Sequence, residues 1–194
     1  MKYENLNMKF YHVNSGEKRN IGDILIFNEK VNNGMYKSLY NNEYKIDNID
    51  ANELVINMKR NNKNTLTNEE LNLILNTLNN DAFVLREIAL EKYRCENHPN
   101  YPSRLHCLYV TPDKENSKKW VKILKRNNKI CNQILTLELV GDLYVFDGGL
   151  MYRLNQSFDN YLKNAKEYWE TTNNFKEPEY LFYGKAKVID VEDI

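Results

Sequence analysis

The sequence predicts a single α+β domain, and three observations favour that class. The chain has 194 residues, which is enough for one hydrophobic core and below the size at which chains usually divide. Strand-like segments cluster apart from a central block of helical patterns. A doubly wound α/β sheet would instead alternate strand and helix throughout.

The charges of the chain are balanced, since Lys plus Arg and Asp plus Glu each number 27. No net electrostatic field therefore favours binding to nucleic acid or anionic lipid.

Two core strands are expected near the start of the chain. Lys9 to Val13 combines aromatic and β-branched residues, and Asp23 to Phe27 is a short apolar run after Gly22. Residues 28–65 show little periodicity and are expected to form a less regular covering region. Their tyrosines could line a helical turn, because they recur every four residues at Tyr36, Tyr40 and Tyr44.

Two successive helices are predicted in the middle of the chain. Thr67 and Glu70 have the spacing of a capping box, in which each side chain satisfies a backbone amide near the other residue. A second helix is expected over 81–95, ending before His98-Pro99, because proline restricts the residue before it. Asparagine pairs are expected to mark loops, since asparagine tolerates turns; they stand at 32–33, 41–42, 61–62, 79–80, 127–128 and 173–174. This asparagine usage is typical of proteins from AT-rich bacterial or phage genomes.

The second half of the chain begins with a strand and a helix. Residues 103–110 alternate like a strand. Pro112-Asp113 then opens a helix with an apolar stripe at Trp120, Ile123 and Leu124 and a basic flank over 118–126.

The last third adds strands on either side of a helix. Residues 133–140 and 143–147 are strand-like around Gly141-Asp142, which forms either a hairpin turn or a bulge in one long strand. Ser157 caps a final helix, and residues 181–191 are expected to form the closing strand.

Several classes of protein are disfavoured by what the sequence lacks. There is no apolar run of membrane-spanning length and no signal-peptide core, so we expect a cytoplasmic protein without membrane contact. Signature motifs of Rossmann, P-loop, zincin and serine-hydrolase proteins are absent. The histidines lack the spacing of a helical metal pair, so no metal is expected. The cysteines are expected to be reduced thiols at Cys95, Cys107 and Cys131.

Motifs in a shared order give the chain a resemblance to a known group. Tyr11-His12 followed by Gly22-Asp23, then Ser103-Arg104 and the late Gly184-Lys185-Ala186 segment, resembles the ADP-ribosyltransferase-like superfamily. Its small members include the rifamycin ADP-ribosyltransferases and relatives of the tRNA 2'-phosphotransferases. The segments Pro102 to Leu105 and Tyr168-Trp169 also resemble an uncharacterised bacterial family of this fold. The resemblance implies two small packed sheets flanked by helices, with NAD bound as a substrate between them.

The resemblance also implies roles for individual residues. His12 matches the histidine that hydrogen-bonds the ribose of NAD. Many members of the group place a glutamate in a late strand, where it stabilises the cationic sugar that forms as nicotinamide leaves; here the candidates are Asp147, which is preferred, and the earlier Glu138. Arg104 would pair with the pyrophosphate. Ser103 or Tyr109 would fix the ribose or nicotinamide, and Tyr11 or Trp120 would stack on the ring. The acceptor of ADP-ribose is an unspecified protein, nucleic acid or small molecule.

Two other functions stay open at this point. Val13 stands where the group usually has a small residue that lets the backbone approach the dinucleotide. This favours a non-catalytic host-interaction or binding module on the same fold, using the surface around Tyr36, Tyr40 and Tyr44. A third possibility is binding of single-stranded nucleic acid through the basic flank over 118–126 with Trp120, since basic and aromatic groups together suit single strands.

Overall fold

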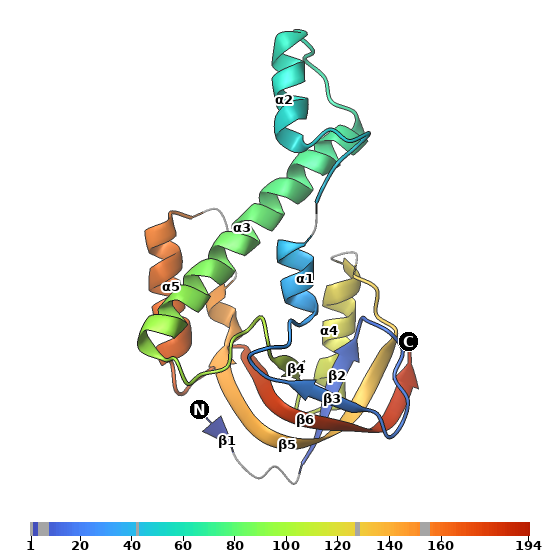
Figure 1. The fold of residues 1–194 in the computed structure, drawn as a ribbon, viewed down its shortest axis with the longest axis vertical. Coiled ribbons are helices and arrows are strands. Elements are labelled where there is room, and N and C mark those ends of the chain that lie inside the picture. The colour runs from blue at the N-terminus through green and yellow to red at the C-terminus, as the bar shows by residue number, and fades with distance from the viewer. Residues whose placement is uncertain (1, 4–7, 42, 127–128, 152–155) are drawn as a thin grey trace.

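One curved antiparallel sheet of six strands organises the molecule, and helices flank it (Figure 1). The computed structural model describes residues 2–3, 8–41, 43–126, 129–151 and 156–194. In chain order the elements are β1 (Lys2–Tyr3), β2 (Lys9–Asn14), β3 (Ile24–Phe27), α1 (Gly34–Tyr40), α2 (Ala51–Arg60), α3 (Asn68–Asn97), β4 (Leu108–Val110), α4 (Lys114–Arg126), β5 (Gln133–Asp147), the 3-10 helix η1 (Gly148–Met151), α5 (Phe158–Glu170) and β6 (Pro178–Asp193). The predicted α+β class is confirmed at this level.

The long strands β5 and β6 form the centre of the sheet. They pair antiparallel along their whole length, from Gln133 opposite Asp193 to Asp147 opposite Pro178. β1 and β2 add to the outer side of β5, while β3 and β4 add to the outer side of β6. A further bridge joins Tyr11 to Thr111, which follows β4 directly. The sheet therefore curls until β2 and β4, from its opposite sides, meet.

Two facing glycines let the central strands approach closely at one point. Gly141 of β5 pairs with Gly184 of β6, and their φ angles are +151° and +140°. A Cβ on Gly141 would stand 2.2 Å from the Tyr183 carbonyl oxygen, and one on Gly184 would stand 2.3 Å from that of Val140. Only glycine fits both positions. The open question about Gly141-Asp142 is answered by one continuous strand.

The prediction of two separate small sheets is corrected to one sheet with two cores. The apolar core contains Phe10, Leu108, Val110, Leu135, Leu137, Leu139, Leu143, Phe182, Ala186 and Val188. The aromatic core contains Leu90, Cys107, Tyr144, Phe146, Ala165, Tyr168, Trp169 and Leu181, and lies against α3 and α5. Alternation along the strands divides the side chains between the two cores, since neighbours in a strand point to opposite faces: Leu181 belongs to one core and Phe182 to the other.

A single helix of 30 residues, α3, replaces the two predicted helices. Its N-terminal capping box, Thr67 with Glu70, is confirmed. The expected break at Asn79-Asn80 is wrong, because asparagine costs an exposed helix only about 0.7 kcal/mol at most and neither proline nor glycine interrupts the run. The amide of Asn80 donates to the Leu39 carbonyl at 3.4 Å, which links α3 to the last turn of α1.

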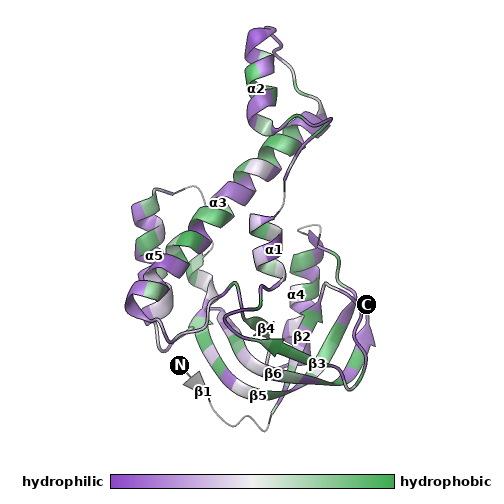
Figure 2. Cartoon of the chain, in the orientation of Figure 1, coloured by the Kyte–Doolittle hydropathy of each residue, from purple (hydrophilic) through white to green (hydrophobic). Residues whose placement is uncertain are grey.

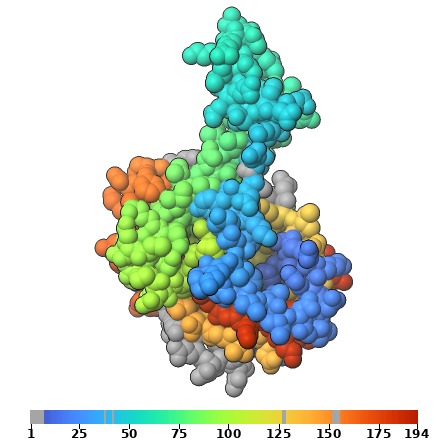
Figure 3. All heavy atoms as spheres, in the orientation of Figure 1, coloured from blue at the N-terminus to red at the C-terminus, as the bar shows by residue number. Residues whose placement is uncertain are grey.

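The first half of α3 and α2 project from the body as an arm, which we define as residues 43–80 (Figures 1 and 3). Its small core consists of Ala51, Leu54 and Leu73 with partly buried neighbours. Much of its remaining apolar surface faces solvent, including Leu71, Leu75 and Leu78 (Figure 2). Residues 28–65 thus contain two helices, α1 and α2, and their second half extends away from the sheet instead of covering it.

Most other expected elements are confirmed, with shifted bounds. The segment 103–110 forms a strand only over its last three residues, and Ser103 to His106 form a turn. The asparagine pairs at 32–33, 61–62 and 173–174 lie outside helix interiors and strands, as expected. Asn42 and residues 127–128 lie outside the described residues.

Candidate active site

His12 contacts the neighbouring strand β4 through its imidazole. Nδ1 lies 2.9 Å from the carbonyl oxygen of Tyr109. A carbonyl only accepts hydrogen bonds, so Nδ1 carries the proton and Nε2 remains an acceptor. Burial lowers the pKa of His12, and the bond to Tyr109 opposes this effect only in part. The imidazole is therefore neutral at pH 7 and suited to accept a hydrogen bond from a hydroxyl group.

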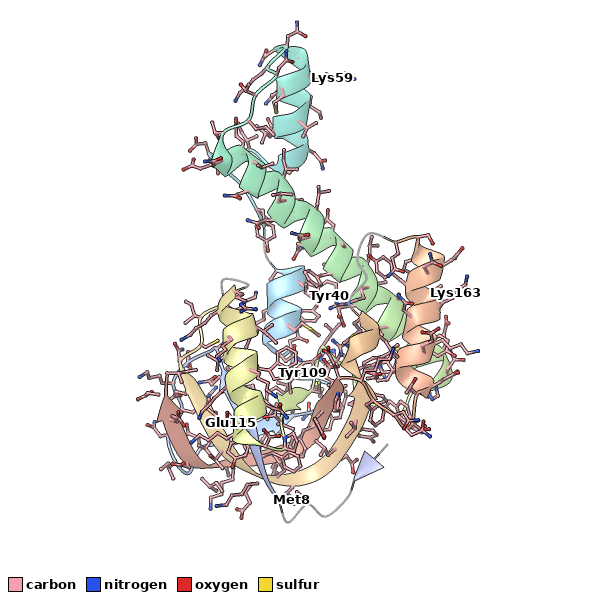
Figure 4. The ribbon with its side chains drawn as sticks, turned by 180° about the vertical axis from the view of Figure 1, so that it is seen from behind. Met8, Tyr40, Lys59, Tyr109, Glu115 and Lys163 are labelled. Atoms are coloured by element: carbon pink, nitrogen blue, oxygen red, sulfur yellow. The ribbon has the colours of Figure 1, made fainter. Side chains whose placement is uncertain are left out.

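Tyr109 connects His12 to the aromatic core. Its hydroxyl donates to the Arg104 carbonyl at 3.0 Å, and the Arg104 guanidinium lies 5.6 Å from the centre of its ring. The Asn33 side chain, which caps α1, donates to the carbonyls of Arg104 and Cys107 at 2.7 and 2.9 Å. Helix α1 is thereby fixed above the turn that precedes β4, and Tyr109 lies below it (Figure 4).

A buried charged cluster lies beside Tyr109. Arg104 Nε donates to Glu87 Oε2 of α3 at 2.9 Å. Arg104 Nη1 donates to the Tyr168 hydroxyl of α5 at 2.9 Å and also to Glu179 Oε2 at the start of β6. The Tyr168 hydroxyl in turn donates to the same Glu179 oxygen at 2.6 Å. The side chains of Arg104, Glu87 and Glu179 are 4%, 1% and 10% exposed, so water screens these charges weakly.

Glu87 holds two guanidinium groups at once. Arg86 also donates to Glu87, at 2.7 Å and 3.0 Å, and its own side chain lies over the Phe83 ring. Burial alone would raise the pKa of Glu87, but Arg104 and Arg86 outweigh burial and lower it. Burial likewise disfavours the charge on Arg104, yet Glu179 and Glu87 raise its pKa well above the ordinary value. Both side chains are ionised across the physiological range.

Asp147, the preferred catalytic carboxylate, lies far along β5 from His12. His12 is opposite Leu135, twelve positions before Asp147 on the same strand (147 − 135 = 12). The Asp147 carboxylate accepts backbone N–H groups of Gly149, Lys176 and Glu177, each at 3.0 Å. These bonds outweigh burial and lower its pKa. The geometry gives Asp147 a role in joining the two chain segments that flank α5.

The other predicted residues have diverse surroundings. Ser103 is buried in the turn, where its Oγ accepts from Leu105 N at 3.2 Å. Tyr11 points to the opposite face of β2 from His12, since side chains alternate along a strand, and its backbone bonds to Thr111. Trp120 on α4 is 38% exposed. Arg104 is committed to the charged cluster, so a pyrophosphate would have to compete with two carboxylates for its guanidinium.

Glu179 and Glu87 were missed by the sequence reasoning. Glu179 stands at the start of the last strand, ahead of the alternating segment Tyr180 to Tyr183, and its position as a late-strand glutamate was a usable signal. Glu87 carries no such signal, because a buried glutamate in a helix has the same sequence appearance as a solvated one.

Two further features complete the surroundings. The hydroxyls of Thr111 and Ser117 form a 2.6 Å hydrogen bond between β4 and α4. An open groove of about 450 Å³ adjoins the Ser103 to His106 turn. The residues that line it include Glu91, Arg94, Tyr101, Ser103, His106 and Tyr183.

Across the part of the chain that the structure describes, no group of His, Cys, Asp and Glu side chains forms a metal site. None of the described helices combines the length and apolar character needed to cross a bilayer.

The chain belongs to the family described as "Protein of unknown function (DUF2441)", whose sequence model matches residues 10–194. The match begins at Phe10, two residues before His12, and includes the whole of the site described above. Curated proteins give no match.

Proposed function

We propose that this protein is an NAD-dependent ADP-ribosyltransferase in which Tyr109 and Glu179 form the centre of the site and His12 supports Tyr109. The observation that carries the proposal is the contiguous path from His12 to Tyr109, Arg104 and Glu179. These residues come from distant parts of the chain, and β2, β4 and β6 lie side by side. His12 is opposite Leu135 of the apolar core and Glu179 is opposite Phe146 of the aromatic core, so their side chains lie on opposite faces of the sheet and Tyr109 links them. The resemblance called for a histidine on the first core strand and a glutamate on a late strand.

Glu179 takes over the role first expected of Asp147. Its two described hydrogen bonds both end on Oε2. Over the described residues no hydrogen bond reaches Oε1, so this oxygen is free to accept one from a sugar hydroxyl. Asp147 has no comparable freedom, because each of its oxygens already accepts a backbone amide.

The proposed reaction breaks the bond between C1' of the ribose and the nicotinamide nitrogen. Nicotinamide leaves with the bonding electron pair, and positive charge develops on C1' and the ring oxygen. The Glu179 carboxylate stabilises that charge, which is an interaction stronger in the transition state than in bound NAD. Neutral His12 donates through Nδ1 to the Tyr109 carbonyl and holds that residue beside the sugar. A nucleophile of the acceptor then bonds to C1' and loses its proton.

The proposal is tested by nicotinamide release and by NAD binding. Purified protein is incubated with NAD labelled on nicotinamide, with and without cell extract, and NAD binding is measured by calorimetry. We expect Glu179→Gln to lower release by about 100-fold or more while NAD still binds, since removal of one electrostatic contact to a transition state commonly has that effect.

Glu138→Gln is the matched control. Glu138 was the alternative carboxylate, and it is exposed on β5 opposite Lys9 and Lys187. This variant should release nicotinamide at the wild-type rate. Absence of both NAD binding and nicotinamide release in wild-type protein would rule out the proposed activity and leave a binding module as the remaining function.

A further inference from the structure

We propose that Arg104 is a positioning residue for Glu179, and that Glu87 controls how much of the Arg104 charge Glu179 receives. The inference rests on the proposed role of Glu179. It differs from the pyrophosphate contact expected for Arg104, because the guanidinium is directed at protein carboxylates and is 4% exposed.

The geometry fixes the Glu179 carboxylate from two directions. Arg104 comes from the turn before β4, and Tyr168 comes from α5, and both donate to Oε2. Arg104 and Tyr168 are themselves hydrogen-bonded at 2.9 Å, so neither donor can rotate away independently. A carboxylate held by one oxygen presents the other oxygen in a defined direction. That second oxygen, Oε1, is the one available to substrate.

Glu87 affects Glu179 through the balance of charge on Arg104. Arg104 alone would give Glu179 its full positive charge, and so strong a neighbour would weaken the attraction of Glu179 for a cationic sugar. Glu87 takes part of that charge through the 2.9 Å bond to Arg104 Nε. Arg86 balances Glu87 in turn, so two guanidiniums and two carboxylates leave the cluster neutral. Breaking any buried pair would leave an uncompensated charge.

Stability alone does not explain such a cluster. Buried ion pairs can often be exchanged for apolar side chains of similar volume without loss of stability. The apolar core on the other face of the sheet shows that this chain can fill a core with leucine, valine, phenylalanine and alanine. A charged cluster retained next to the late-strand glutamate is accounted for by what it does to that glutamate.

The ionisable groups near Glu179 come from each element packed around it. They are Arg104 and Cys107 in and after the turn, Tyr109 on β4, Tyr168 on α5, Glu87 and Arg86 on α3, and Asp147 on β5. Arg104 is the cation in direct contact with Glu179, and Tyr168 is the direct neutral donor.

The test compares Arg104→Lys with the double variant Glu87→Gln/Arg104→Met. The double variant removes one positive and one negative charge together, so the net charge of the cluster stays zero while Glu179 loses the cation that contacts it. The first readout is the ¹³C chemical shift of the Glu179 carboxyl at pH 7 in protein with labelled glutamate; Glu179→Gln identifies the resonance. The second readout is the split between kcat and KM for nicotinamide release.

We expect the ¹³C resonance of the Glu179 carboxyl to move in the double variant, because the contacting cation is gone. Its kcat should fall by about 10- to 100-fold, with KM for NAD within about twofold, since positioning affects the transition state more than ground-state binding. Arg104→Lys should restore most of the wild-type chemical shift and part of kcat.

The outcomes separate this inference from the proposed function. An unchanged ¹³C resonance of the Glu179 carboxyl in the folded double variant would overturn the positioning role, whatever the activity. A moved resonance without any nicotinamide release by wild-type protein would support the coupling between Arg104 and Glu179 and overturn the transferase. A fall in kcat that Arg104→Lys does not relieve at all, with equal thermal stability, would also overturn the positioning role.

Discussion

The two faces of the sheet support cores of very different chemistry. The apolar core is built from aliphatic side chains and phenylalanine. In the aromatic core Phe146 and Tyr168 each pack edge to face with Trp169 at 4.7 Å between ring centres, and they stack on each other at 5.2 Å. This core borders the buried charges of Arg104, Glu87 and Glu179. Both cores share β5 and β6, so one pair of strands supplies opposite faces to each.

The apolar core maintains the fold, whereas the aromatic core lies beside the buried polar and charged side chains. Aliphatic packing gains stability in proportion to the area removed from water. Buried charges gain little net stability, because desolvation offsets their attraction. The charged cluster lies on the aromatic face of the sheet. The apolar core on the other face stabilises the strands that hold the cluster in position. The predictions below test this division of roles.

The largest effect is expected where the two cores meet. Gly184→Ala would place a Cβ 2.3 Å from the Val140 carbonyl oxygen at a φ of +140°. The backbone has to move, and both cores lose register, so we expect a loss of about 4 kcal/mol or more in the free energy of unfolding. Urea unfolding measures it. Gly34→Ala, at a position with open space around the new Cβ, is the control; equal stability of both variants would contradict the close contact.

A cavity in the apolar core should lower stability without changing chemistry. Leu137→Ala removes a fully buried side chain of that core and is expected to cost about 3 kcal/mol. The rate of nicotinamide release per folded molecule should stay within about twofold at a temperature where the variant is folded. A large fall in that rate would mean that the two cores are not separate in function.

The aromatic core should show the opposite behaviour. Tyr168→Phe keeps the ring but removes the hydroxyl that bonds to Arg104 and Glu179. We expect a loss of about 1 to 2 kcal/mol in unfolding free energy, typical of one buried hydrogen-bonding group, together with a clear fall in kcat. If the variant kept full activity, the hydroxyl would have only a structural role.

Acid should weaken the aromatic core through Glu87. Its folded-state pKa lies below the ordinary value of 4.5, because Arg104 and Arg86 outweigh burial. A lowered carboxyl pKa contributes stability above the unfolded-state value, and this contribution is lost as pH falls below it. Glu87→Gln should therefore lose less stability than wild type between about pH 5 and pH 3, by on the order of 1 kcal/mol. Urea unfolding at each pH measures the free energy of unfolding of both proteins. Equal losses in the two proteins as pH falls would contradict this prediction.

The smallest effect concerns His12. Burial lowers its pKa from 6.5, so the neutral form is favoured in the folded protein. The stability that this shift provides is present above pH 6.5 and is lost as pH falls through the range below it. His12→Asn should remove this component, which we expect to be under about 1 kcal/mol. Stability measured across pH 5 to 7.5 in both proteins checks it, with His106→Asn as the control substitution.

Local sequence patterns predicted the ends of individual helices more reliably than the continuity of long elements and of the sheet. The capping box of Thr67 and Glu70, the stop before Pro99 and the cap at Ser157 act within a few residues and were all recognisable. The continuity of α3 through Asn79-Asn80 depends on a balance of small propensities that the rest of the helix decides. Fusion of the expected sheets depends on Gly141 meeting Gly184, which are 43 positions apart (184 − 141 = 43).

Sequence patterns pointed to candidate site residues one at a time and did not show which of them meet. His12 was singled out because Tyr11-His12 matches the opening motif of the resemblance. Arg104 was singled out, but for a pyrophosphate, because the sequence does not reveal that Glu87 and Glu179 converge on it. Asp147 was preferred over Glu138 because it precedes two glycines. Its carboxylate instead binds backbone amides from across α5, contacts that arise only in the folded chain.

The pairing of β2 with β5 has a consequence for how the chain folds during synthesis. Asn14 and Gln133 are hydrogen-bonded partners 119 positions apart. At about 5 to 20 residues per second, roughly 6 to 24 seconds pass before the ribosome supplies the partner of the first long strand. The capped helix α3 can form meanwhile from local contacts, whereas the N-terminal strand stays without its ladder. Because β5 is synthesised before β6, β2 can pair with β5 first, and the central β5–β6 pair is completed only when the last strand is made.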